Sequence, residues 1–504
     1  MTTAGSLDPV EQEQVAASSI VITTEPGQLV ALGDYLFAGP LVIRNGPDGL
    51  AVTETLDTET YLLGIREVPF DWPIEALKTQ AVAARTYLAF TLAQGRTSTG
   101  RTYGYDICAT TACQVYAGRR GLQSEEGQRW QAAVAATAGE ILLYNGAPAQ
   151  ALYSSTAGTR TRESEDIFPG LNPPYLGAVD SPGEDSPYVD WSFAITEQEM
   201  ETLLATQEIL AGPLHSISVS TTPDGGGPWQ VVVRSGTSVA SFGTYQFRSE
   251  INRAAAAAMP DRLPAQRPDG RRYPQTVLSG TYQITERSVV VEHEGYRELA
   301  REFVFNGHGW GHQVGMSQFG AKAMADRGSA YPAILAHYYG GLTPSPAGAW
   351  LPEQITVGLQ VGVEEVTVLA PTGATVSADG VELAAGVAVW RFAADAGGIT
   401  TSIPSGIGTG PQVRARLPYR PDGYHLAFHL TAPAEVTISG TLNGQALEPL
   451  SLGLIEAGFY DYLLGEVFAD LPSGVLKIRI SATSPYGDYT RGSCWCRSDA
   501  DALE

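Results

Sequence analysis

The sequence predicts an α+β fold: a main domain of mixed strands and helices, followed by a β-rich, sandwich-like extension. The 504-residue chain has 56 Gly and 32 Pro but only 17% charged residues, which is typical of turn-rich, β-rich globular proteins. Short runs of Val, Ile and Thr bounded by turn residues indicate strands at 19–66 and again after 355. Apolar residues at three- and four-residue steps between 74 and 92 indicate a long helix with one face toward a core.

Composition along the chain divides it into four segments. Residues 1–18 form a flexible polar leader, 19–345 the main domain, 346–354 a linker, and 355–504 a β-rich accessory region of one or two modules. A chain of this length exceeds a single hydrophobic core, and about three domains are expected.

Local signals define the elements of the main domain. Residues 61–65 are apolar and end at a turn, so we expect a strand before the long helix. Asn145-Gly146 is the turn signal of a β-hairpin, and Thr196 with Glu199 forms a capping box at the start of a helix. The further expected elements are a second hairpin at 216–236, a helix at 244–258, strands at 280–305 and a helix capped by Ser317.

The charge balance restricts the class of partner. The formal net charge is −23, and no basic stripe is present that could neutralise phosphates, so a nucleic acid partner is not expected. An anionic polymer would have to be held by hydrogen bonds and stacking. No apolar run approaches the length of a membrane span, and the first residues lack the basic start and apolar core of a secretory signal.

One carboxylate stands apart from the others. Glu67 lies between the expected strand and the long helix and is followed by Val68, Pro69, Phe70 and Trp72. An acid in apolar surroundings is poorly hydrated, so its pKa should be raised toward the range that a general acid needs. The alternative interpretation is an exposed loop carboxylate or a partner of the helix dipole.

Two long motifs in this chain resemble the two signatures of the SpoIID/LytB family. The first is TYLLGIREVPFDWPIEALKTQAVAARTYLAF at 60–90, and the second is GHGWGHQVGMSQFGAKAMADRGSAYPAILAHYYGG at 307–341. Their order and their separation of more than two hundred residues agree with the family pattern. The resemblance extends over roughly residues 35–345 and identifies the main domain as a SpoIID-like catalytic domain.

The resemblance implies a peptidoglycan lytic transglycosylase. Such an enzyme cleaves the MurNAc-β-1,4-GlcNAc bond and forms 1,6-anhydro-MurNAc ends. Ordinary glycosidases need two carboxylates, but here the sugar's own 6-hydroxyl attacks, so one acid suffices. The resemblance assigns the acid/base role to Glu67 and an assisting role to Arg85.

Three alternatives remain open. The first is a LytB-like modifier that binds the cell wall and stimulates an N-acetylmuramoyl-L-alanine amidase without cutting glycan. The second is a hydrolase in which Glu165 or Asp166 supplies a second carboxylate. The third is a structural β-rich surface protein.

The family motifs also suggest residues for substrate binding. His308 and His312 are four residues apart, but the glycines between them argue against a helix that presents both to a metal. The chain departs from the family pattern at Gly177, where a lysine is common, and at Gln313, where a glycine is common. The predicted substrate-binding residues are Gln80, Tyr153, Ser154, Ser155, Thr156, Tyr175, His308, Trp310, His312 and Gln318.

Cys108 and Cys113, separated by four residues, are best interpreted as a local disulfide. Some members of the family hold zinc near this place with two cysteines and a histidine, but no histidine lies between these two. Zinc with a distant histidine and free thiols are the alternatives, and no other cofactor is expected. The resemblance further implies action outside the cytoplasm on peptidoglycan glycan strands, with a cell-wall amidase as a further candidate partner.

Overall fold

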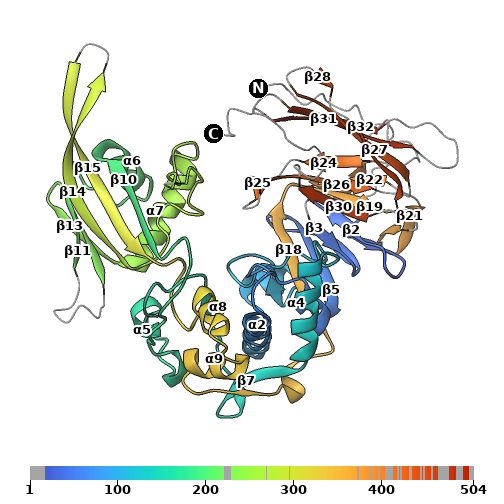
Figure 1. Ribbon diagram of the computed structural model, residues 1–504, viewed down its shortest axis with the longest axis horizontal. Helices are drawn as coiled ribbons and strands as arrows, with labels where there is room; N and C mark the ends of the chain where they lie inside the picture. Colours follow the sequence, from blue (N-terminus) through green and yellow to red (C-terminus); the bar gives the residue numbers. More distant parts are fainter. Residues whose placement is uncertain are drawn as a thin grey trace. The chain divides into compact units, whose positions relative to one another are not determined.

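The computed structural model describes residues 17–33, 35–220, 229–267, 269–293, 296–371, 374–385, 388–395 and 398–402, together with strands between 413 and 498 (Figure 1). The predicted leader lies outside these residues except at its last two positions. Helices and several sheets are both present, which confirms the α+β class. Within the described residues, no helix combines the length and apolarity needed to cross a membrane.

The chain forms two compact units that are interleaved along the sequence. The first unit comprises Met1–Glu67, Gly95–Ser124 and Pro352–Glu504, and the second comprises Val68–Gln94 and Glu125–Leu351. This differs from the predicted consecutive segments, because strands after the expected linker complete sheets that begin before Glu67. As functional modules, the four consecutive segments stay a prediction.

The first unit contains two sheets that each combine strands from distant parts of the sequence. In the larger one β18 (Gln354–Val363) pairs with β5 (Gly49–Asp57), although some three hundred positions separate them in the chain. Its order is β21 (Val381–Ala385), β20 (Thr375–Ala378), β1 (Ser19–Thr23), β4 (Leu41–Gly46), β5, β18 and β6 (Ile107–Cys108). The second has the order β23 (Gly398–Ser402), β22 (Ala388–Asp395), β19 (Glu365–Ala370), β2 (Val30–Leu32) and β3 (Tyr35–Phe37).

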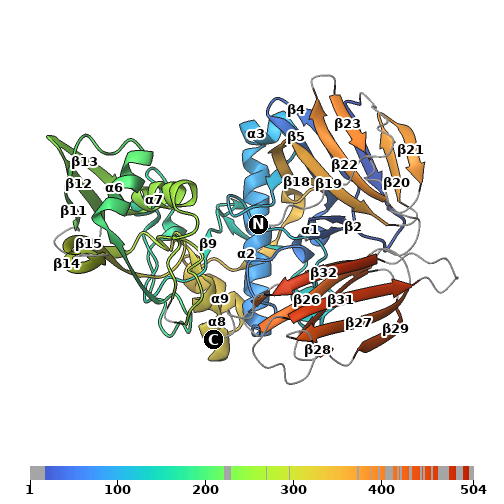
Figure 2. The same ribbon diagram turned by 90° about the horizontal axis from the view of Figure 1, so that it is seen from above.

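The described residues at the end of the chain add strands to the first unit, as expected for a β-rich extension. Figure 2 shows these strands in orange and red. One sheet contains β24 (Val413–Arg416), β25 (Tyr419–Arg420), β26 (Gly423–Leu430) and β30 (Gly458–Leu463). The other contains β27 (Ala434–Leu442), β28 (Gln445–Ala446), β29 (Leu450–Ile455), β31 (Leu476–Thr483) and β32 (Gly492–Ser498).

The strand expected at 61–65 is wrong, because its first three residues belong to helix α1 (Thr58–Leu63), Gly64 is the C-cap, and Ile65 alone makes a bridge, to Tyr116. The Asp57 side chain accepts a hydrogen bond from the Thr60 N–H and caps the helix. Tyr61 and Leu62 are fully buried. A short apolar run does not distinguish a buried strand from a buried helical turn, and here the cap decides between them. A second short helix, α3 (Ser98–Tyr103), also belongs to this unit.

Helix α2 (Ile74–Gln94) is the central element of the second unit. It packs against α4 (Glu125–Ala136), α8 (Gln318–Asp326), α9 (Tyr331–Tyr338) and β7 (Glu140–Tyr144) (Figure 1). The expectation of a single buried stripe is therefore wrong. Nearly every side chain from Ala76 to Ala89 is buried, whereas Ile74 is 38% exposed.

The rest of the second unit follows the local signals. Asn145 and Gly146 both have positive φ and join β7 to β8 (Ala147–Pro148), as a two-residue hairpin requires. The capping box of Thr196 and Glu199 begins α6 (Glu197–Thr206). The remaining elements are η1 (Pro174–Leu176), α5 (Ser164–Ile167), α7 (Thr244–Ala258), β9 (Tyr153–Ser154), β16 (Met316–Ser317), β17 (Pro344–Pro346) and η2 (Gly348–Trp350).

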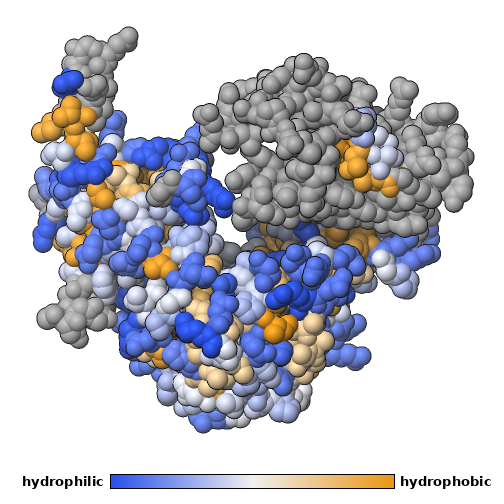
Figure 3. Space-filling model, in the orientation of Figure 1, coloured by the Kyte–Doolittle hydropathy of each residue, from blue (hydrophilic) through white to orange (hydrophobic). Residues whose placement is uncertain are grey.

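Two three-stranded sheets surround a hydrophobic core in the second unit. One has the order β10 (Asp190–Thr196), β15 (Tyr296–His308), β14 (Tyr282–His293), and the other is β11 (Leu214–Ser220), β12 (Gln230–Ser235), β13 (Ser238–Gly243). Figure 3 shows apolar side chains at the surface of the β14–β15 hairpin. There the cross-strand partners Val290 and Leu299 are 60% and 71% exposed, so this end of the hairpin lies outside the core.

Candidate functional site

Glu67 ends the first of the three segments that form the first unit, and its carboxyl group is held by a backbone donor. The Val115 N–H donates to Glu67 Oε1 at 2.6 Å. The neighbouring backbone bonds, from the Arg66 N–H to the Val115 carbonyl (2.9 Å) and from the Ala117 N–H to the Gly64 carbonyl (2.8 Å), pair the two segments like strands. Because Oε1 accepts this N–H, a proton carried by the half-buried side chain would reside on Oε2.

A disulfide stands directly before the segment that holds Glu67. Cys108 and Cys113 are joined, with their Cα atoms 5.5 Å apart. The closed loop is folded back on itself, because the Tyr116 N–H donates to the Ala109 carbonyl at 3.1 Å. The disulfide therefore restrains the backbone two residues before the Val115 donor. Among the described residues, no group of three or more His, Cys, Asp or Glu side chains is arranged to hold a metal ion.

The aromatic residues that follow Glu67 in sequence belong to the second unit. Phe70 stacks on Trp130 with ring centroids 5.1 Å apart, and Trp72 meets Phe319 edge-on at 4.9 Å. Both rings thus contribute to the packing of that unit. The role of Glu67 as acid/base, and the apolar surroundings predicted for it, stay predictions.

Arg85 lies in α2 and has no exposed surface. Its Nη1 donates to the Glu140 carbonyl (3.2 Å) and lies 3.5 Å from the Thr137 hydroxyl, and its Nη2 donates to the Val134 carbonyl (3.3 Å). These acceptors lie in the last turn of α4 or just after it, where carbonyls lack intrahelical partners and a cation complements the helix dipole. The guanidinium therefore fastens α2 to the end of α4, and its assisting role in the reaction stays a prediction.

Gln80 and Gln318, both predicted to bind substrate, are brought together between α2 and α8. Gln318 Nε2 donates to Gln80 Oε1 at 3.3 Å, and the residues are 6% and 1% exposed. Gln80 Nε2 is buried without a hydrogen-bond partner among the described residues. A buried amide donor without an acceptor is unfavourable, so an additional acceptor would be stabilised at this pair.

The predicted hydroxyl segment 153–156 lies beside the second family motif, because β9 and β16 pair in parallel. The Ser154 hydroxyl accepts from the Gln313 N–H at 3.0 Å. The Thr156 hydroxyl is fully buried and lies 2.6 Å from that of Ser186, while the half-buried Ser155 hydroxyl lies 3.2 Å from that of Thr156. The Ser155, Thr156 and Ser186 hydroxyls therefore form a connected polar network inside the unit, while Ser154 bonds to the backbone of the second motif.

Three of the predicted aromatic binding residues are packed against other rings. Tyr153 meets Tyr87 edge-on at 6.5 Å, and Tyr175 lies 5.0 Å from Tyr144 and accepts a hydrogen bond from the Gln150 N–H. Burial raises the pKa of the Tyr175 hydroxyl. The half-buried Trp310 meets Tyr188 edge-on at 4.8 Å, and its backbone pairs with that of Thr156.

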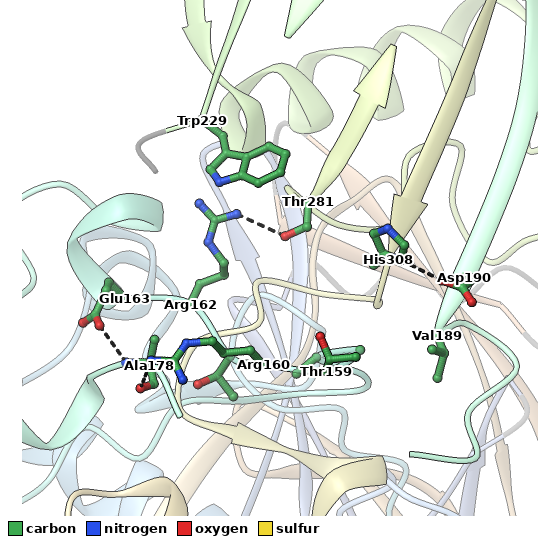
Figure 4. A pocket seen from close by; sticks show the side chains of 13 residues that line it. Thr159, Arg160, Arg162, Glu163, Ala178, Val189, Asp190, Trp229, Thr281 and His308 are labelled. Atoms are coloured by element: carbon green, nitrogen blue, oxygen red, sulfur yellow. Dashed lines mark hydrogen bonds and ion pairs between the residues drawn. The ribbon is translucent and has the colours of Figure 1, made fainter. Parts of the chain in front are cut away.

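The two predicted histidines have different environments. His312 is half-buried beside Phe168, and burial lowers its pKa to about 4, with Arg248 adding to the effect. Its Nδ1 accepts from the Val314 N–H at 3.1 Å, so the ring is neutral near neutral pH. His308 is exposed at the end of β15, where Nδ1 lies 2.6 Å from Asp190 Oδ1. It lines a cavity of about 590 Å³ (Figure 4).

Gln313 connects these groups, although the sequence marked it only as a departure from the family. It is 2% exposed, and its φ of 62° is the left-handed conformation that favours glycine. Its Nε2 donates to the carbonyls of Ala157 (2.9 Å) and His308 (3.1 Å), and its Oε1 accepts from the Thr281 hydroxyl (2.7 Å). Because so many bonds converge on this amide, the cost of the backbone conformation is offset.

The candidate second carboxylates are placed as follows. Glu165, exposed in α5, accepts from the Gly170 N–H at 3.1 Å, and Asp166 forms an ion pair with Arg162 at 3.7 Å. Sequence reasoning missed Glu184, which is half-buried and accepts from the N–H groups of Ala157 and Gly158. Burial raises the pKa of Glu184. Nothing in its local sequence signals this position.

Comparisons with known proteins connect this chain to proteins of cell-wall and sporulation biology. The family model described as SpoIID, Stage II sporulation protein, matches residues 47–144. An uncharacterized protein of Brachyspira hyodysenteriae is 28% identical over 337 residues, covering 66% of this chain and 78% of the relative. Stage II sporulation protein D of Bacillus subtilis is 28% identical over 359 residues, covering 68% and 88%.

A relative with a different name matches over a shorter part. The protein named Amidase enhancer from Bacillus subtilis is 29% identical over 300 residues, which cover 55% of this chain and 39% of that protein. The match therefore spans well under half of that relative.

Proposed function

Because this chain belongs to the SpoIID/LytB family, we propose that it is a peptidoglycan lytic transglycosylase that cleaves the MurNAc-β-1,4-GlcNAc bond. The observation that carries the proposal is Glu67, a half-exposed carboxyl group held in one orientation by the Val115 N–H. Preorganised geometry of this kind is what an acid/base residue needs. The names of the relatives support action outside the cytoplasm, at the cell wall.

In the proposed reaction a single carboxyl group acts twice. Glu67 gives its proton to the glycosidic oxygen as the bond to C1 breaks, and the 6-hydroxyl of the same MurNAc forms the new bond to C1. The carboxylate then takes the proton of that hydroxyl. The acid is regenerated, and no water is consumed.

Product chemistry tests the proposal. Purified peptidoglycan digested with the protein should yield 1,6-anhydro-MurNAc ends, and Glu67→Gln should lower the rate about 100-fold or more. Glu125→Gln, which changes an exposed carboxylate at the start of α4, is the matched control and should retain full activity. New reducing ends in place of anhydro ends would instead support a hydrolase, and Glu165→Gln and Asp166→Asn would then identify its second carboxylate.

The relative named Amidase enhancer favours a second candidate function. In that case the chain binds glycan and stimulates an N-acetylmuramoyl-L-alanine amidase without cutting. The burial of Arg85 at the end of α4 is compatible with this role, because it gives the residue a structural task. In the experiment, the protein is added to a cell-wall amidase and the amidase activity is measured. Stimulation that is equal for wild type and Glu67→Gln, without anhydro products, would select this function.

A further inference from the structure

The cavity beside His308 lies entirely within the second unit. Its floor is the segment 157–163, and Trp229, Thr281 and the Asp190–His308 pair form its walls (Figure 4). Its volume of about 590 Å³ falls within the range of small-molecule sites in proteins. The cavity therefore has room for a ligand of the size of a sugar with a substituent.

Arg162 is the buried cation of this cavity. The residue is only 8% exposed. Its backbone is fixed, because its N–H donates to the Gln313 carbonyl at 2.7 Å. Its Nη1 donates to the Thr281 hydroxyl at 3.1 Å, and that hydroxyl donates in turn to Gln313 Oε1. Figure 4 shows the guanidinium directed toward Trp229. The hydrogen bond to Thr281 thus holds the Arg162 side chain in place from one side.

Most of the hydrogen-bonding capacity of Arg162 is unused. A guanidinium has five N–H donors, and in the described part of the chain one of them makes a hydrogen bond, to Thr281. Asp166 forms an ion pair with Arg162, 3.7 Å from Nη2, which balances part of the charge but lies beyond hydrogen-bond distance and uses none of these donors. A buried charge is stable only with close partners, and a carboxylate can accept two parallel bonds from this planar group. The free donors therefore favour a carboxylate ligand.

The other cation at the cavity, Arg160, is hydrogen-bonded to its acidic partner. Arg160 donates to Asp180 at 2.6 Å and to the Ala178 carbonyl at 3.0 Å. Its side chain is also 56% exposed, so its attraction for an anion is weakened by solvent. Two arginines two positions apart thus differ in what they can offer a ligand.

The walls suit the body of a sugar. Trp229 lies over the Arg162 guanidinium at 5.5 Å and presents an aromatic surface to the cavity. Across the cavity, the exposed His308 and Asp190 lie 2.6 Å apart and offer polar atoms for hydroxyl groups. An aromatic surface, polar side chains and one buried arginine with unused N–H donors together match an amino sugar that bears a carboxylate.

We propose that this cavity binds the carboxylate of an N-acetyl sugar or of its peptide substituent through Arg162, with the sugar ring between Trp229 and the Asp190–His308 pair. The proposal rests on the proposed function for the sugar, and it deepens that function by assigning the group that is recognised. Two sources carry such a carboxylate in peptidoglycan: the lactyl ether of muramic acid, and the peptide attached to it.

Binding of small probes tests the site without any cleavage. Calorimetric titration of the wild-type chain should show N-acetylmuramic acid binding about tenfold or more tighter than N-acetylglucosamine, which lacks the carboxylate. The methyl ester of N-acetylmuramic acid should bind no better than N-acetylglucosamine. N-acetylmuramoyl-L-alanine moves the carboxylate outward, so tighter binding of this probe would assign the peptide as its source. Equal binding of all four probes would overturn the proposal.

Substitutions test whether Arg162 is the residue that recognises the carboxylate. Arg162→Gln should reduce N-acetylmuramic acid binding to the level of N-acetylglucosamine, whereas Arg253→Gln, which changes an exposed arginine of α7, should leave both unchanged. Arg160→Gln should have a smaller effect than Arg162→Gln. A circular dichroism spectrum with wild-type features establishes that each variant is folded, and the ester comparison tests the site even if Arg162→Gln does not fold. Unchanged carboxylate preference in folded Arg162→Gln would overturn the assignment.

The two proposals fail in different ways. A carboxylate preference in a chain that releases no anhydro ends would overturn the transglycosylase and leave the site standing. Anhydro ends lost in Glu67→Gln, together with equal binding of acid and ester, would overturn the site and leave the reaction standing.

Discussion

Arg85 and Arg162 are both buried arginines of the second unit, yet they lie in regions with opposite properties. At the contact of α2 with α4, Arg85 is 0% exposed and donates to the Val134 and Glu140 carbonyls. At the cavity, Arg162 makes one hydrogen bond among the described residues and faces open space. Burial alone therefore does not reveal the role of an arginine. The number of donors that the fold already uses is the more informative property.

The largest expected effect is on the free energy of unfolding, which should fall by different amounts when each arginine is replaced. Arg85→Met should lower the free energy of unfolding by about 4 kcal/mol, because it removes the hydrogen bonds of a fully buried guanidinium to the Val134 and Glu140 carbonyls. Arg162→Met should cost about 2 kcal/mol, because it removes one hydrogen bond and the ion pair with Asp166. Urea unfolding of the two variants measures both values. Similar losses would contradict the distinction between the two regions.

His312 adds a half-buried histidine to the comparison, and its ring is neutral near neutral pH. Its pKa is lowered to about 4 from an ordinary value of 6.5, so its contribution to stability is complete above pH 6.5 and is lost as the pH falls toward 4. The shift corresponds to about 3 kcal/mol. Between pH 6.5 and pH 4, the free energy of unfolding of the wild type should fall by about this amount relative to that of His312→Asn. Unfolding measured as a function of pH tests this. Parallel pH profiles would show that the ring is not held neutral.

The disulfide extends the comparison to Glu67, whose carboxyl group accepts a hydrogen bond from the Val115 N–H. Replacing Cys108 and Cys113 with Ser should lower the free energy of unfolding by about 2 kcal/mol, as closure of a short loop implies. Release of anhydro ends should also fall, because the Val115 donor is then less restrained. Both quantities are measured with and without a thiol reductant. The double variant is its own control, since a further response to reductant would implicate other cysteines.

The smallest expected effect concerns the one hydrogen bond of Arg162. Thr281→Val removes the hydroxyl that accepts from Nη1 and should lower the free energy of unfolding by about 1 kcal/mol. Binding of N-acetylmuramic acid should weaken severalfold, while binding of N-acetylglucosamine should stay the same. Thr159→Val, at the same cavity but with its hydroxyl outside this chain of bonds, is the comparison variant. Equal effects of the two substitutions would argue against the role given to Thr281.

Much of the fold followed from sequence, and the failures share a cause. The strands at 19–57, the second hairpin and the helix at 244–258 were all predicted correctly. The stretch 61–65 was predicted as a strand but its first three residues are helical, because short apolar runs fit either structure. The single stripe expected on α2 was wrong, because four elements distant in sequence surround that helix.

For the candidate site, the motifs identified the segments but not the residues that connect them. They drew attention to Ser154 and Gln318, which make buried hydrogen bonds, and to His308, which lies at the cavity. They gave no sign of Arg162, Thr281 or Trp229. These side chains come from three separate segments, and no local spacing relates them.

The sequence by itself determined the features that depend on neighbours within a few positions: the capping box of Thr196 and Glu199, the Asn145-Gly146 turn and the Ser317 cap. Each is a hydrogen bond or a backbone preference that the local residues satisfy alone. Only the tertiary structure decided which buried polar groups are used up and which are left with free donors. That outcome depends on acceptors supplied by distant segments, as the difference between Arg85 and Arg162 shows.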